Sequence, residues 1–135
     1  MANSRRFGHA WVTLSLVVAA HVADETLTDF LSVYNPAVRA LHARYAWFPM
    51  PVWEFREWLT GLCVAVAVLL LLAPLAYARS RVLRVVAYPF ALLMLLNGVL
   101  HLAGSAYLGY WMPGATTAPL LLVASVWLFS ETMRW

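Results

Sequence analysis

Four long apolar stretches run along the chain, and short polar or proline-containing segments separate them. The stretches cover about residues 7–31, 52–78, 82–107 and 116–133. A helix needs about 20 apolar residues to cross the hydrocarbon core of a bilayer. Four spans and their connections therefore use almost all of the 135 residues. The pattern predicts one all-α domain over residues 1–135, an integral membrane four-helix bundle.

The segment between the first two stretches differs from a plain loop. Asn35 and Pro36 precede residues 37–45, where charged and apolar positions alternate as in a short helix. Trp47 and Phe48 follow, and aromatic residues beside arginines are typical of a membrane–water interface. We therefore predict a short interfacial helix between the first and second spans.

Composition supports the membrane assignment and narrows the function. Hydrophobic residues make up 64% of the chain and charged residues 11%, whereas soluble domains carry about 25% charged residues. The net charge is +3 and every basic residue is an arginine. Most of these arginines flank apolar stretches, where they orient helices. Nucleic-acid binding is therefore not expected.

The arginines also predict an orientation. Those near the termini and in the turn after the second stretch fall on one side of the membrane if there are four spans: Arg5, Arg6, Arg79, Arg81, Arg84 and Arg134. Basic residues accumulate on the cytoplasmic side. The connector opposes this weakly, since it also carries arginines. We expect a multi-pass protein of the cell membrane with both termini in the cytoplasm.

Polar residues interrupt the apolar stretches in two patterned groups. His21, Asp24 and Glu25 stand at i, i+3 and i+4, which places them on one face of the first helix. Asn97 and His101 stand at i and i+4 on the third helix, and form a second stripe. The spacing thus predicts two polar stripes that can face each other.

Depth along the helices puts both groups in one layer. At 1.5 Å per residue, His21 lies about 22 Å from Arg6, and His101 about 25 Å from Arg84. In a core about 30 Å thick, both lie in the outer half. A charged side chain at mid-helix costs roughly 2.5–3.5 kcal/mol on insertion scales. These residues are therefore expected to face the bundle, a partner or a water-filled cavity.

Ionisable residues inside a membrane are functional candidates by default. The predicted catalytic group is His21, Asp24, Glu25, Asn97 and His101. Neighbouring residues on the outer side are predicted to contact substrate: Glu54, Glu57, Trp58, Ser105 and Thr116. Two other interpretations stay open. The polar layer can be a structural network that locks helix packing, or a shorter first helix can leave Asp24, Glu25 and Asp29 at the wet boundary.

Three short motifs resemble the HXXEE family of small multi-pass membrane proteins. Residues 21–25 (His-Val-Ala-Asp-Glu) are similar to the family signature, with Asp in place of its first Glu. Residues 97–101 resemble its Asn-x-x-x-His element, and residues 110–118 its Pro-Gly-x-x-Thr-Ala stretch. Residues 26–30 depart from the Pro-Gly-Gly-Phe type of segment that often follows the signature. The resemblance implies a small, enzyme-like membrane protein but no particular reaction.

The residues favour two kinds of catalysis. A carboxyl group in an apolar pocket can act as an acid near neutral pH, with a histidine as its counterpart. Such a pair suits isomerisation, cyclisation or dehydration of an isoprenoid, sterol-like or lipid substrate. Alternatively, His21, Glu25 and His101 are a common ligand set for Zn or non-haem Fe, in a membrane hydrolase or oxidase. The sequence leaves open whether the cofactor is absent or one of these ions.

A third hypothesis is a non-catalytic lipid-binding or assembly subunit. Four short helices barely enclose a pocket, so a homo-oligomer or another partner is compatible with the chain. For the enzyme hypotheses we expect a pocket lined by Trp and Leu residues. It should open toward the outer leaflet between the first and third spans.

Overall fold

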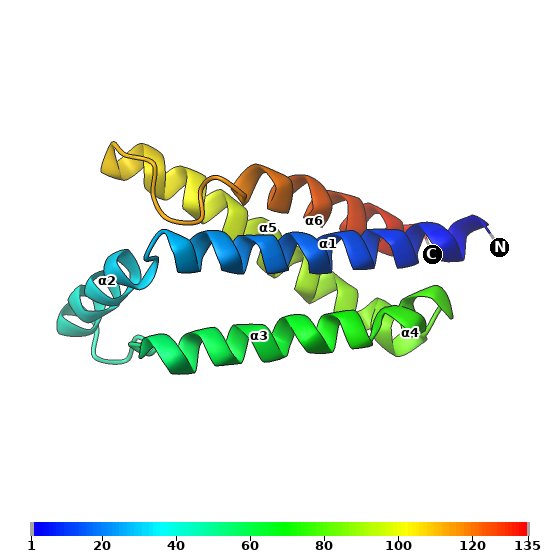
Figure 1. The fold of residues 1–135 in the computed structure, drawn as a ribbon, viewed down its shortest axis with the longest axis horizontal. Coiled ribbons are helices and arrows are strands. Elements are labelled where there is room, and N and C mark those ends of the chain that lie inside the picture. The colour runs from blue at the N-terminus through cyan, green and yellow to red at the C-terminus, as the bar shows by residue number, and fades with distance from the viewer. Residues whose placement is uncertain (1, 135) are drawn as a thin grey trace.

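The computed structural model describes residues 2–134, with side chains from residue 5 onward, and over this range its regular structure is helical. Its helices are α1 (Ala2–Leu27), α2 (Leu31–Arg44), α3 (Phe55–Leu71), α4 (Ala73–Tyr77), α5 (Arg81–Leu108) and α6 (Ala118–Met133). The central helix is α1, which packs against α3 and α4 on one side and α6 on the other (Figure 1). The prediction of an all-α chain is confirmed for the described residues.

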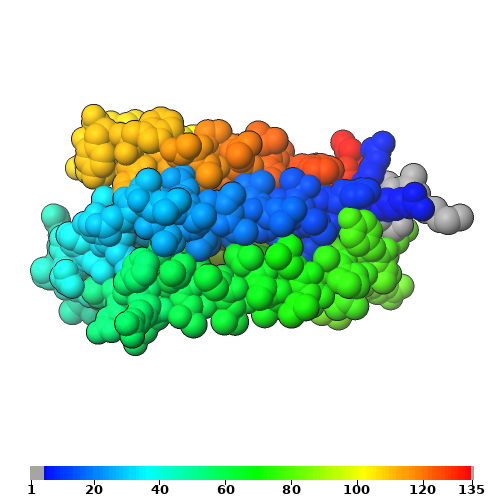
Figure 2. All heavy atoms as spheres, viewed as in Figure 1, coloured from blue at the N-terminus to red at the C-terminus, as the bar shows by residue number. Residues whose placement is uncertain are grey.

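Both chain ends lie at the same end of the elongated molecule, because α6 runs back along α5 (Figure 1). The space-filling view shows α1 between α3 on one side and, on the other, α6 and the segment that precedes it (Figure 2). At the opposite end lie α2 and the loop between α5 and α6. These two segments enclose the polar residues of the predicted site.

Three helical stretches are long and apolar enough to cross a membrane: Arg5–Leu27, Phe55–Tyr77 and Arg81–Leu108. Three of the four predicted spans are therefore confirmed as helices of sufficient length. The fourth, Ala118–Met133, is apolar but has 16 residues, a length of about 24 Å at 1.5 Å per residue. It packs against both α1 and α5, and several of its residues, including Leu121 and Leu128, are buried.

Several boundaries differ from the predicted ones. The first helix ends at Leu27 rather than at residue 31, because Asp29 adopts a left-handed conformation with φ 58° and α2 begins two residues later. The interfacial helix is consequently longer than predicted and contains Pro36. The second stretch breaks at Leu72, just before Pro74, which cannot donate to the helical ladder and sits in the first turn of α4.

An apolar core fills the end of the bundle that carries the termini. Trp11 of α1 is fully buried, and its Nε1 donates to the carbonyl oxygen of Leu69 at 2.8 Å. Small residues let α5 and α6 approach closely: a Cβ on Gly98 would lie 3.1 Å from the carbonyl oxygen of Ala118. Small interfacial residues are a common means of helix association in membranes. This packing holds α1, α5 and α6 in register, and so determines which polar residues meet further along.

Candidate functional site

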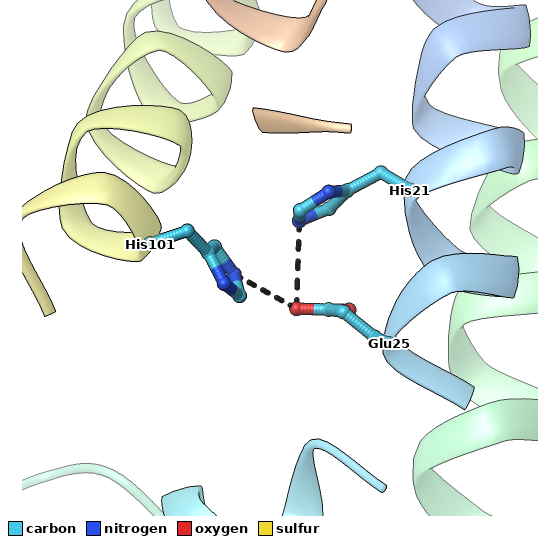
Figure 3. A group of neighbouring side chains, drawn as sticks. All are labelled: His21, Glu25 and His101. Atoms are coloured by element: carbon cyan, nitrogen blue, oxygen red, sulfur yellow. Dashed lines mark ion pairs between the residues drawn. The ribbon is translucent and has the colours of Figure 1, made fainter. Parts of the chain in front are cut away.

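Three buried side chains from two helices converge at one point. His21 and Glu25 lie one turn apart on α1, and His101 approaches from α5 (Figure 3). The Nε2 of His101 is 3.0 Å from Oε1 of Glu25, and the Nε2 of His21 is 3.5 Å from the same oxygen. All three residues are at most 5% exposed. The predicted convergence of the two stripes is therefore confirmed, and we call these residues the His–Glu–His cluster.

The hydrogen bonds of His101 determine which ring nitrogen carries its proton. Its Nδ1 is 2.7 Å from the carbonyl oxygen of Pro113, and a carbonyl only accepts, so Nδ1 donates. In neutral His101 the Nε2 atom then has no hydrogen, and its lone pair points at an oxygen of Glu25. Two lone pairs do not hold a separation of 3.0 Å without a positive centre between them. The contact between His101 and Glu25 therefore needs either a shared proton or a metal ion.

His21 is oriented in a similar way through Thr117. The Thr117 hydroxyl donates to Oδ2 of Asp24 at 2.9 Å and lies 2.7 Å from Nδ1 of His21. The carboxylate is a stronger and closer acceptor for the single hydroxyl hydrogen than the Gly114 carbonyl oxygen at 3.3 Å, so Nδ1 of His21 donates to Oγ1. Asp24 also accepts from the backbone N–H of Thr117 at 3.0 Å, at the start of α6, where the helix dipole favours negative charge. Asp24 thus orients His21 indirectly, because it fixes the Thr117 hydroxyl that contacts Nδ1 of His21.

Asn97 completes the ring of contacts around His21. Its Oδ1 lies 3.0 Å from Nε2 of His21. An amide can present an acceptor or, after a half-turn, a donor. Asn97 is therefore able to accommodate His21 in either protonation state, and it faces the cavities described below. The predicted proximity of Asn97 to the cluster is confirmed.

The loop between α5 and α6 closes the cluster on one side. Gly114 has φ +83°, and a Cβ on it would come within 2.5 Å of Cε1 of His101 and 3.0 Å of Cγ of Glu25. The loop is attached to α5 by Ser105, whose Oγ accepts from the N–H of Met112 at 3.1 Å. Close backbone approach at a glycine therefore seals the cluster.

Two neighbouring cavities reach the cluster. The larger, of about 670 Å³, lies between α2 and α5, and its wall is mostly apolar side chains together with Asn97 and His101. The smaller, of about 360 Å³, lies between α2 and α3 and includes Glu25 and Glu57. The residues that line both cavities are Phe30, Tyr34, Met50 and Asn97. An apolar molecule in either cavity would therefore contact the cluster.

This arrangement corrects the predicted position of the pocket. The larger cavity lies between α2 and the third span, rather than between the first and third spans, because α2 folds over the side of α5. Leucines line it as predicted, including Leu93, Leu96 and Leu100. The tryptophans Trp53 and Trp58 line the smaller cavity instead.

The five predicted substrate-contacting residues have different surroundings. Glu57 and Trp58 line the smaller cavity, whereas Glu54 is exposed at the start of α3 and lies outside both cavity walls. Ser105 is buried, donates to the carbonyl oxygen of His101 at 2.8 Å and supports the loop. Thr116 is exposed and accepts from Nε1 of Trp111 at 3.0 Å. The threonine that touches the cluster is thus Thr117, the next residue.

Sequence reasoning missed several residues that shape the site. Thr117 had a partial signal, since threonine is common directly before a helix, although its hydroxyl bonds Asp24 here and does not cap α6. Gly114 and Phe30 had weaker signals. Nothing in the nearby sequence indicates that Gly114 will contact His101, or that the Phe30 ring will lie 5.3 Å from the His101 ring.

Comparison of the chain with family models, curated proteins and solved structures finds no match.

Proposed function

We propose that this protein is a membrane-embedded enzyme that converts a hydrophobic molecule by acid–base chemistry at the His–Glu–His cluster. The observation that carries the proposal is the contact of 3.0 Å between His101 and Glu25, which needs a positive centre and lies at the wall of apolar cavities. A proton held between a carboxylate and an imidazole can be delivered to a substrate and taken back. The apolar lining supports an isoprenoid, sterol-like or lipid substrate.

An isomerisation illustrates how the charges balance. The shared proton passes to one carbon of a substrate double bond, whose electron pair forms the new C–H bond and leaves positive charge on the neighbouring carbon. Loss of a proton from an adjacent carbon to the Glu25–His101 pair re-forms a double bond one position along and restores the pair. Cyclisation uses the same first step. Dehydration begins instead with protonation of a hydroxyl group, which leaves as water.

The experiment that tests this proposal is a search for conversion in lipid. Purified protein is placed in nanodiscs made from a total lipid extract of the expression host, and the extract is compared by mass spectrometry before and after incubation. An isomerase or cyclase produces a species of unchanged mass and new retention time, whereas a dehydratase lowers the mass by one water. An extract that stays unchanged with native lipids and with added isoprenoids contradicts the proposal.

A metal-dependent enzyme is the second candidate, and the ligand geometry favours it specifically. One ligand atom from each of His21, Glu25 and His101 lies within 4.8 Å of the others. With bonds of about 2.0–2.1 Å, tetrahedral Zn²⁺ separates neighbouring ligands by about 3.3 Å, close to the two His–Glu distances. Each histidine also donates from its other nitrogen, to Pro113 or Thr117, as metal-bound histidines do. A bound ion would activate a water molecule there.

Bound metal distinguishes the two candidates. For the acid–base enzyme, we expect protein purified without chelator to contain less than about one-tenth of an equivalent of Zn or Fe by inductively coupled plasma mass spectrometry. One equivalent that disappears in both His21→Ala and His101→Ala would establish the metal enzyme and overturn the acid–base proposal. Glu54→Gln is the matched control, since it removes an exposed carboxylate from outside the cluster.

The exposed apolar surface supports insertion in the cell membrane as a multi-pass protein. Only 6% of the residues in the most apolar 18-residue part of Phe55–Tyr77 are buried. A soluble monomer rarely exposes so large an apolar patch. We assign this face to contact with lipid or with a second copy of the chain. The three motifs that resemble the HXXEE family support membership of that family.

Both termini are proposed to lie in the cytoplasm, and single cysteines test this. In a Cys63→Ala background, Ala40→Cys on α2 should react with a membrane-impermeant maleimide in intact cells. Ala78→Cys in the arginine-rich turn and Met133→Cys at the end of α6 should react only after permeabilisation. All three positions are exposed. Labelling of Met133→Cys together with Ala40→Cys, but not Ala78→Cys, in intact cells would mean that α6 does not cross the membrane. Labelling of Ala78→Cys and Met133→Cys without Ala40→Cys would mean the opposite orientation.

A further inference from the structure

The smaller cavity combines aromatic rings with carboxylates. Phe30, Tyr34, Trp53 and Trp58 contribute rings to its wall, and Glu25 and Glu57 contribute carboxylates. The Phe30 ring stacks on Trp58 at a centroid distance of 6.1 Å and lies 5.5 Å from the Tyr34 ring. Among the described residues that line this cavity, none is basic. Such a wall is electrostatically negative, because the aromatic faces and the Glu57 carboxylate attract positive charge, whereas the charge of Glu25 is already offset at its contact with His101.

The Tyr34 ring in this wall is neutral and held in place. Burial raises the pKa of the Tyr34 phenol, so the ring stays neutral at ordinary pH. Its hydroxyl donates to the carbonyl oxygen of Pro51 at 3.0 Å, which fixes the ring relative to the connector. Asn35 holds the same connector through two hydrogen bonds with the backbone of Trp53, at 2.9 and 3.0 Å. The aromatic wall is thus positioned before any ligand arrives.

We infer that the smaller cavity binds a single positive charge on a hydrophobic molecule whose apolar part lies in the larger cavity. The two cavities share four residues, so one molecule can occupy both. Glu57 is exposed at the start of α3, where a charged group stays near water. Recognition of quaternary ammonium groups by aromatic cages is an established use of this chemistry. The inference rests on the proposed function only in using the same cavities.

The charge can come from two sources. It can be a permanent ammonium group in the substrate, or it can develop on carbon after protonation of a double bond beside Glu25. The two sources share the same recognition chemistry, since both place a diffuse cation against rings and a carboxylate. If an ammonium compound is itself converted, the substrate carries the charge. If it instead inhibits conversion of a neutral alkene competitively, the charge develops during the reaction.

Binding of dodecyltrimethylammonium tests the inference against its uncharged all-carbon isostere. Each is added to protein in zwitterionic nanodiscs at matched mole fractions of the lipid, the ammonium compound below its micelle concentration, with empty nanodiscs subtracted, and binding is followed by tryptophan fluorescence. We expect the native chain to bind the ammonium about tenfold more tightly than the isostere. Glu57→Gln should abolish most of this preference without weakening binding of the isostere. Glu54→Gln, an exposed carboxylate of the same segment outside the cavity, should leave the preference intact.

The outcomes separate this inference from the proposed function. Equal affinity for the two compounds, or equal loss in Glu54→Gln and Glu57→Gln, overturns the cation site but leaves the cavity as a site for neutral lipids. Failure of both compounds to bind, together with an unchanged lipid extract, contradicts both proposals. Trp58→Phe gives an independent measurement, because it keeps a ring in the wall and should retain part of the preference.

Discussion

Replacing Glu25 by Gln is expected to lower the rate of substrate conversion about 10²- to 10⁴-fold, the usual contribution of a positioned acid or base. Glutamine keeps the shape of the side chain, and its amide N–H can donate to the unprotonated Nε2 of His101. It cannot hold the proton that lies between His101 and Glu25 in the acid–base enzyme. It is also a poor replacement for a carboxylate ligand, so the loss is expected under the metal mechanism too.

The fold should survive this substitution. Glu25 is 5% exposed, and a neutral amide is less costly to bury than a carboxylate. We expect size-exclusion profiles and helical circular dichroism to match those of the native protein, while product formation in nanodiscs is lost. Glu54→Gln serves as the control with full activity. Native activity in Glu25→Gln would mean that the His–Glu–His cluster is a packing network and not a reaction centre.

Gly114→Ala is expected to destabilise the protein by about 3 kcal/mol and to displace His101. Two effects add at this position. The backbone angle φ of +83° is unfavourable for any residue with a Cβ. The added methyl group would also collide with the imidazole of His101 and the side chain of Glu25. Neither group can retreat easily, since His101 is held by Pro113 and both are buried.

Gly109→Ala separates the two effects. Gly109 also has a positive φ, of +74°, but a Cβ there has no atom within 4 Å. We expect a cost of about 1 kcal/mol from backbone strain alone, with the site intact. The comparison is the midpoint of thermal unfolding in detergent, Tm, for both variants. Gly61→Ala is measured beside them, since Gly61 has neither a positive φ nor a neighbour within 4 Å of an added Cβ. Equal shifts in Tm for Gly109→Ala and Gly114→Ala would contradict the close packing of the loop on His101.

Hydrophobic periodicity predicted the helices well and their ends poorly. Apolar runs of sufficient length give helices whether or not their partners are known. The ends depend on single backbone conformations, such as the left-handed Asp29 that separates α1 from α2. Pro74 was a visible signal for the break in the second stretch, because proline has no N–H to donate to the carbonyl four residues earlier. Asp29 had a weaker signal: aspartate tolerates the left-handed conformation, but Asp24 lies within α1, so the residue type alone does not mark where the helix ends.

Side chains on one helix were predictable as a group, but contacts between helices were not. His21 and Glu25 share a face because they are one turn apart, and this follows from the helical repeat alone. The choice between Thr116 and Thr117 depends on the path of the turn that leads into α6, which begins at Ala118. Both threonines precede the helix, so helical spacing does not specify which of them meets Asp24 and His21.

The sequence by itself determined the all-helical class, three long apolar helices and two polar stripes, because each follows from spacing within one segment. Only the tertiary structure decided that the stripes meet at Glu25, that Gly114 closes the cluster and that α2 covers two cavities. These features depend on helix rotation and on the path of two connecting loops. Both are set by packing between distant segments, so no local pattern of residues specifies them.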